Sequence, residues 1–152
     1  MIIELLQLAS SFLLGLLVGS LLTEAIILVP YWRTMPAKEF LALHHSLGPK
    51  LLAYFKPLTI LATFAPVLTA VVTFVLGEVF HWLSIVPAVL TLIMLVIYFG
   101  YFKGANESFK SGSVGAEGLA DELARWAKWH WLRVVIGCVA FFVSLLVLSG
   151  GV

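Results

Sequence analysis

Residues 5–30 of the chain read LLQLASSFLLGLLVGSLLTEAIILVP, and this stretch decides the class of fold. From Leu5 to Val29 it is long enough to cross the hydrocarbon core of a bilayer, which needs about 20 helical residues, and Pro30 ends it. Because a segment in lipid must satisfy its own backbone hydrogen bonds, it must be a helix. No Lys or Arg precedes it, and it exceeds the ~7–15 residues of a signal-peptide core, so we expect a retained membrane span.

Three further apolar runs have the same character, at about residues 51–76, 82–101 and 131–148. The chain is 62% hydrophobic and 11% charged, whereas a soluble domain carries about 25% charged residues. A chain of 152 residues cannot bury so much apolar surface in its own interior, so lipid must cover the rest. The sequence therefore predicts an all-α membrane protein, in which a single domain spanning residues 1–152 folds as an antiparallel bundle of four transmembrane helices.

The link between the first two runs carries a pattern of its own. Phe40, Leu41, His44 and Leu47 recur at helical spacing, which predicts a short amphipathic helix at the membrane interface. Gly48-Pro49 is expected to end this helix before the second span begins.

The basic residues predict the orientation in the membrane. All nine fall in or beside the first and third links, whereas the short second link, residues 77–81, and both termini have none. By the positive-inside rule the basic side faces the cytoplasm and both termini face out, in a plasma (inner) membrane. The nine residues are Arg33, Lys38, Lys50, Lys56, Lys103, Lys110, Arg125, Lys128 and Arg133.

Glu24 is the sharpest single signal of function. It lies within the first span, roughly 9 Å along the helix from Pro30 at about 1.5 Å per residue. A carboxylate at that depth is costly and by default suggests a functional role. The structural alternative is that Glu24 pairs with Arg133 or a histidine, or is a protonated acid that hydrogen-bonds across helices.

The start of the fourth span, residues 125–133 (RWAKWHWLR), is dense in aromatic and basic side chains. Trp126, His130 and Arg133 share one helix face at i, i+4 and i+7. An arginine behind indole rings suits an anionic or quinone-like headgroup, although a snorkelling arginine in an aromatic belt gives the same pattern. The candidate catalytic residues are Glu24 and His130, and the candidate substrate-binding residues are Asn106, Trp126, Trp129 and Arg133.

The histidines leave open whether the chain carries no cofactor, a haem or a metal ion. His44 and His45 are adjacent, and neither has a histidine or carboxylate four residues away. They cannot chelate one metal as an i, i+4 pair, so a site would need ligands from several helices, with His130 as the third candidate. The alternative is that these histidines hydrogen-bond to lipid headgroups. The single cysteine, Cys138, cannot form an internal disulfide.

Two groups of residues resemble a known family. One is residues 29–33 (VPYWR) followed by residues 35–37 (MPA), and the other is Asn106 followed by Arg125-Trp126 with His130 and Arg133. The chain is similar in these features and in layout to the anthrone-oxygenase-like family of small four-span membrane proteins. The resemblance implies an oxygenase that converts an anthrone to an anthraquinone without a bound cofactor. The pair His44-His45 departs from the family pattern.

Three hypotheses about function stay open at this point. The first is an oxidoreductase or oxygenase that acts on a hydrophobic aromatic or quinone-like small molecule at the cytoplasmic side of the bilayer. The second is a non-catalytic subunit that binds lipid or a partner, as a homo-oligomer or within a larger membrane complex. The third is a haem- or metal-binding electron-transfer protein. Nucleic-acid binding is not supported, because the basic residues are those that topology requires.

The predicted orientation can be tested by labelling single cysteines in a Cys138→Ser background. We expect a membrane-impermeant maleimide to label Ser149→Cys in intact cells, because the positive-inside rule places the C-terminus outside. Ser113→Cys, in the third link, should be labelled only after the membrane is permeabilised. The reverse pattern, with Ser113→Cys labelled in intact cells, would contradict the assignment.

Overall fold

The computed structural model describes residues 1–76 and 82–149, and these residues are helical apart from short turns. The predicted short link at residues 77–81 and the end of the chain, residues 150–152, lie outside the described residues. The helical segments are α1 (Ile2–Thr23), η1 (Glu24–Leu28), α2 (Val29–Trp32), α3 (Ala37–Val75), η2 (Trp82–Ser84), α4 (Ile85–Ile97), η3 (Tyr98–Phe102), α5 (Lys103–Ser111) and α6 (Gly115–Leu148).

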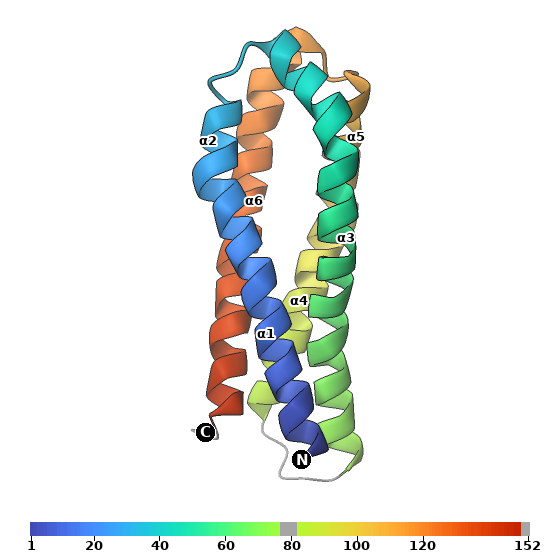
Figure 1. Ribbon diagram of the computed structural model, residues 1–152, viewed down its shortest axis with the longest axis vertical. Helices are drawn as coiled ribbons and strands as arrows, with labels where there is room; N and C mark the ends of the chain where they lie inside the picture. Colours follow the sequence, from blue (N-terminus) through green and yellow to red (C-terminus); the bar gives the residue numbers. More distant parts are fainter. Residues whose placement is uncertain (77–81, 150–152) are drawn as a thin grey trace.

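These segments join into four long helical columns that run side by side (Figure 1). The columns are residues 2–32, 37–75, 85–111 and 115–148, and each is long and apolar enough to cross a membrane. Consecutive columns run in opposite directions, and both chain ends lie at one end of the bundle, here called the terminal end. The opposite end, with the α2–α3 link and the α5–α6 turn, is called the basic end. The chain is thus an integral membrane protein, as predicted.

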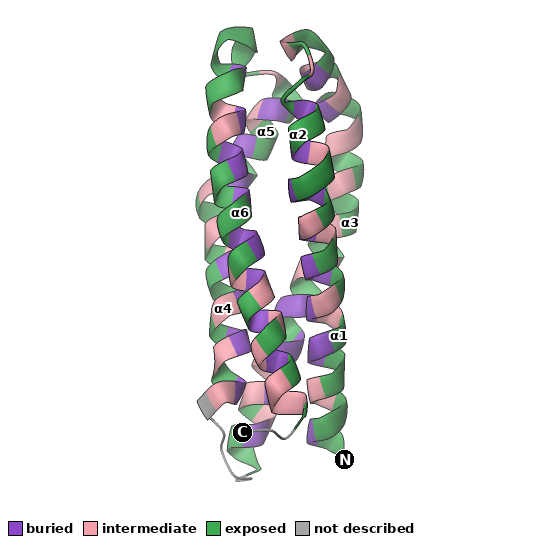
Figure 2. Cartoon of the chain, turned by 90° about the vertical axis from the view of Figure 1, so that its left-hand side faces the viewer, coloured by how far each residue is buried: buried purple, intermediate pink, exposed green. Residues whose placement is uncertain are grey.

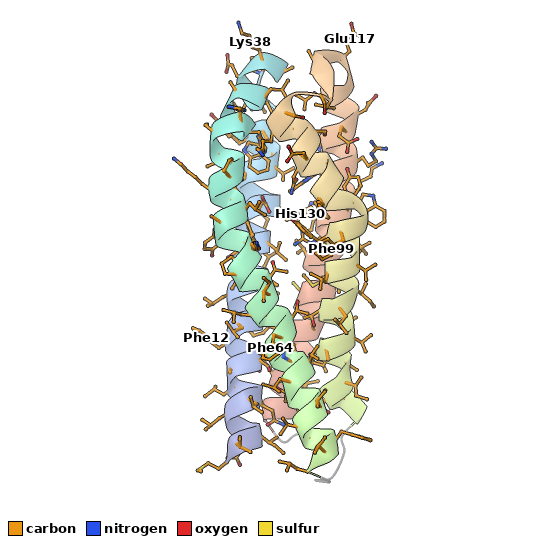
Figure 3. All side chains as sticks on the ribbon, turned by 90° about the vertical axis from the view of Figure 1, so that its right-hand side faces the viewer. Phe12, Lys38, Phe64, Phe99, Glu117 and His130 are labelled. Atoms are coloured by element: carbon orange, nitrogen blue, oxygen red, sulfur yellow. The ribbon has the colours of Figure 1, made fainter. Side chains whose placement is uncertain are left out.

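The outer surface of the bundle is largely apolar from the terminal end to the middle, whereas exposed lysines such as Lys50, Lys56 and Lys103 lie nearer the basic end. Phe12, Phe64 and Phe99 point away from the bundle on three different columns (Figure 3), and each is at least 60% exposed. Buried residues form inward stripes on each helix, with exposed residues on the other faces (Figure 2). This arrangement suits lipid, because lipid tails are as apolar as these side chains and cover them without exposing them to water.

The interior contains two packed clusters at different heights. The first is aromatic, lies towards the basic end and includes Trp32, Phe40, Phe102, Phe109 and Trp126. The second is aliphatic, lies nearer the middle of the bundle and is built from Leu17, Leu21, Ala25, Ala62, Met94 and Val134.

The amphipathic segment after the first span is helical, as predicted, but the predicted break at Gly48-Pro49 is absent. α3 runs without interruption from Ala37 to Val75. A proline inside a helix removes one hydrogen bond and crowds the carbonyl four residues earlier. Gly48 beside it leaves open space, because a Cβ built there would meet nothing within 4 Å. Phe40 and His44 also pack against Phe109 of α5, which holds this part of α3 in place.

Two π-helical turns interrupt the first and third columns, and one of them includes Glu24 whereas the other includes Phe102. In η1 the N–H of Val29 bonds to the oxygen of Glu24, and the wider turn lies directly before Pro30, which has no N–H and would crowd a regular helix. In η3 the N–H of Lys103 bonds to the oxygen of Tyr98. Such turns are frequent at functional sites. Both place side chains that face the interior towards the basic end.

Gly15 and Gly19, which lie one turn apart on α1, give a matched test of the packing. A Cβ on Gly15 would lie 3.2 Å from the ring of Phe141 on α6, whereas a Cβ on Gly19 would meet nothing within 4 Å. We expect Gly15→Leu to lower the free energy of unfolding by about 1–3 kcal/mol through overpacking. Gly19→Leu should not lower it, because the new side chain meets open space and leucine favours a helix more than glycine does. Reversible unfolding in mixed micelles measures both, and equal losses would contradict this packing.

Candidate functional site

The centre of the candidate site is the ring of His130 on α6, which is 0% exposed. Its Nε2 lies 3.0 Å from the carbonyl oxygen of Leu21 on α1. A carbonyl can only accept a hydrogen bond, so Nε2 carries the proton and donates it to Leu21. The same Nε2 lies 3.7 Å from Oε2 of Glu24, beyond hydrogen-bond distance, and this contact is ionic only when both ring nitrogens carry a proton. The two candidate catalytic residues therefore meet between α1 and α6.

Arg133 brings a positive charge to the same level of the bundle. It is 6% exposed and lies one turn beyond His130 on α6. Its guanidinium lies over the ring of Phe102, with Cζ 4.6 Å from the ring centroid. A buried charge is costly in a medium without water, and the face of an aromatic ring offsets part of that cost.

Two polar atoms of this cluster are buried without a hydrogen-bond partner. They are Nδ1 of His130 and Nε of Arg133. Since Nε2 of His130 carries the proton, Nδ1 of the neutral ring has a lone pair and can accept a proton. Nε of Arg133 can only donate. Unsatisfied buried groups of this kind are uncommon in folded proteins, and a bound molecule would complete them.

Aromatic rings enclose the cluster on the side of the basic end. Trp126 stacks on His130 with ring centroids 4.8 Å apart and an angle of 16°. Phe102 meets Trp126 edge to face at 5.2 Å. The indole Nε1 of Trp126 donates to Oδ1 of Asn106 on α5 at 2.9 Å, which fixes the ring over His130. Asn106, which the sequence suggested as a substrate-binding residue, thus holds the ring of Trp126 through this hydrogen bond.

His44 lies in a second aromatic layer, further towards the basic end. It stacks on Phe40 at 4.0 Å and meets Trp32 edge to face at 4.8 Å. Trp32 in turn lies 6.0 Å from Trp126, so two indole rings separate His44 from His130. His45 is exposed and its Nδ1 lies 3.3 Å from the carbonyl oxygen of Lys110.

The three candidate metal ligands, His44, His45 and His130, therefore occupy three different places. Within residues 1–76 and 82–149, no three His, Cys, Asp or Glu side chains are grouped so that they could hold a metal ion. Glu24 and His130 do lie close together, but they make up a pair and not a group of three.

Trp129 belongs to a different cluster, on the outer surface of α6. It is 38% exposed and stacks on Tyr101 at 5.6 Å. The Tyr101 hydroxyl donates to Glu122 at 2.9 Å, and Arg125 pairs with the same carboxylate. The structure thus brings Trp126 to the buried site and leaves Trp129 at the lipid-facing side, where aromatic residues are common near membrane interfaces.

Phe102 and the Leu21 carbonyl are site components that sequence reasoning missed. Phe102 is fully buried and contacts both Trp126 and Arg133, yet in the sequence it is one of several aromatic residues that end an apolar run. The backbone oxygen of Leu21 leaves no trace in residue types. Pro30 was an available signal, because a proline after a long apolar helix favours an irregular turn just before it.

The fold and the site together define an integral membrane protein whose bundle buries an acid, a histidine and an arginine behind aromatic rings. Comparison with protein families, with curated proteins and with solved structures finds no match to this chain. The resemblance to the anthrone-oxygenase-like family is not tested by these comparisons and stays a prediction. The geometry of the site is therefore the basis for a proposed function.

The Asn106–Trp126 hydrogen bond can be measured by a double-mutant cycle. Trp126→Phe and Asn106→Leu each remove one partner, and we expect a coupling of about 0.5–1.5 kcal/mol, the net value of one such bond. As a control, Trp129→Phe combined with Asn106→Leu should show no coupling, because Trp129 contacts Tyr101 instead. Unfolding in mixed micelles gives the energies. Equal coupling in the two cycles would show that the bond does not orient Trp126.

Proposed function

We propose that this protein is a membrane oxidoreductase of the oxygenase type, which acts on a hydrophobic aromatic substrate inside the basic half of the bundle. The observation that carries the proposal is the contact of the Glu24 carboxylate with His130 at 3.7 Å, next to the buried Arg133 and beneath stacked aromatic rings. An ionisable pair inside a membrane span is costly to maintain, which favours a functional role over a structural one.

The chemistry suits a substrate with a weakly acidic C–H bond that is conjugated with a carbonyl group, as in an anthrone, where the methylene carbon lies across the central ring from the carbonyl carbon. Glu24, or the free Nδ1 of His130, takes the proton from the ring methylene carbon as a general base. The negative charge moves to the carbonyl oxygen, where the guanidinium of Arg133 stabilises it. Arg133 is suited to this role because its Nε is buried without another partner.

Dioxygen is the oxidant in this proposal. The deprotonated ring carbon gives electrons to O₂ and forms a carbon–oxygen bond. The O–O bond then breaks, the second hydrogen of the methylene group is lost, and one oxygen stays on the ring as a new carbonyl group. The other oxygen leaves as water with the two hydrogens, so one anthrone and one O₂ give one anthraquinone and one water.

The surroundings favour a flat, apolar substrate. Trp126 and Phe102 offer ring faces and edges beside the acid–base pair, and aromatic pairs favour stacked or edge-to-face contact. The outer surface of the bundle is largely apolar, so a lipid-soluble molecule reaches it through the bilayer. The family resemblance, through residues 29–33 and the Arg125-Trp126 motif, favours the same class of reaction.

The test is oxygen uptake by the purified protein in lipid nanodiscs with anthrone as substrate. We expect Glu24→Gln to reduce kcat by about 10²–10⁴-fold, the usual contribution of general acid–base catalysis. Glu117→Gln is the matched control, since Glu117 is exposed at the basic end (Figure 3) and should leave the rate unchanged. Arg133→Lys should lower the rate as well, because lysine lacks the planar fork of donors.

Two results would count against the proposal. One is no oxygen uptake with anthrone or quinol substrates by a homogeneous, folded preparation. The other is a rate that Glu24→Gln and Glu117→Gln change equally. If the protein is recovered from native membranes only together with other subunits and is inactive alone and in the complex, the non-catalytic alternative replaces the enzyme.

A further inference from the structure

A second polar region lies towards the terminal end of the bundle, beyond the aliphatic cluster. A small cavity there takes its lining from all four columns. Its polar lining consists of Gln7 and Ser10 from α1, Thr69 from α3, Ser84 from η2 and Ser144 from α6.

Three of the four lining hydroxyl groups have already committed their protons. Thr69 donates to the carbonyl of Ala65 at 2.8 Å, and Ser144 donates to that of Phe141 at 2.7 Å. Oγ of Ser10 lies 2.9 Å from Oγ1 of Thr69. Because a hydroxyl has one proton and that of Thr69 is used, Ser10 is the donor of this bond. What Ser10 and Ser144 still offer is lone pairs, so a ligand must donate to them.

The Ser84 hydroxyl differs from the other three because its proton is not used in a hydrogen bond. It is 4% exposed, lines the cavity, and its Oγ is buried without a hydrogen-bond partner. A buried hydroxyl without a partner is destabilising. Its proton is free, so Ser84 can donate to the same ligand that donates to Ser10 or Ser144. A hydroxyl is the smallest neutral group that gives one proton and accepts another, which suits a cavity of this small size.

The lining contains no charged side chain. An ion would lose its hydration without a counter-charge, which is prohibitive in an apolar medium. We propose that this cavity is a binding site for one neutral O–H group, which comes from water or from a small alcohol dissolved in the membrane. This site is independent of the proposed oxygenase activity.

The experiment uses amide NMR spectra of the isotope-labelled protein in nanodiscs, with ethanol as the probe. We expect ethanol to shift the amide signals of Ser84 and Ser144 saturably. Acetonitrile, which is of similar size and accepts but does not donate hydrogen bonds, can use only the Ser84 proton and should bind about tenfold more weakly than ethanol. Ser84→Ala and Ser144→Ala should each weaken ethanol binding about tenfold, the effect of one hydrogen bond.

Ser11→Ala is the matched control. Ser11 is 3% exposed and its Oγ also lacks a partner, but it does not line the cavity. It should leave ethanol binding unchanged, and unaltered signals elsewhere in the spectrum verify the fold of each variant.

A water arm separates the two sources of the O–H group. Magnetisation transfer from water to the Ser84 amide that disappears as ethanol binds supports a site open to both. Transfer from water that Ser84→Ala abolishes, with no ethanol effect, supports the site with water as its occupant. The proposal is overturned by a cavity with neither water nor ethanol contact, by equal binding of acetonitrile, or by equal effects of Ser84→Ala and Ser11→Ala.

Discussion

The contact of the buried His130 of α6 with α1 is the interaction on which the basic half of this protein depends. The Nε2 of His130 donates to the carbonyl oxygen of Leu21 at 3.0 Å and lies 3.7 Å from Oε2 of Glu24, and both side chains are less than a tenth exposed. In an apolar medium a buried polar group without a partner is costly. The contact therefore favours one register of α6 against α1, and in this register Trp126 and His130 lie in the interior.

The irregular turns lie beside the same contact but have a cause of their own. A regular helix through Glu24 followed by Pro30 would crowd its own carbonyl groups, whereas the π-turn η1 relieves that crowding and ends just before the proline. η3 ends at Phe102, whose ring covers the Arg133 guanidinium. The first and third columns thus depart from regular geometry near the site, whereas α3 and α6 are regular helices along their length.

Much of this could be predicted from sequence, because it depends on local patterns. Hydrophobic runs give the four columns, and the i, i+4, i+7 spacing correctly puts Trp126, His130 and Arg133 on one buried face. What could not be predicted depends on contacts between helices: the Leu21 carbonyl under His130, and the bond from Trp126 to Asn106. Trp129 shows the limit, since composition alone does not separate a buried indole from one at the lipid surface.

The aliphatic cluster forms an apolar layer inside the bundle. Leu17, Leu21 and Met94 are almost fully buried and belong to this cluster, and along α1 Leu17 lies between the cavity residue Ser10 and the site residue Glu24. A proton or a water molecule does not cross such a layer readily, because it would lose its hydrogen bonds there. We therefore expect Glu24 and His130 to exchange protons with the basic end or with a ligand. The two polar regions of one short bundle can then bind different ligands without forming a continuous path for protons across the membrane.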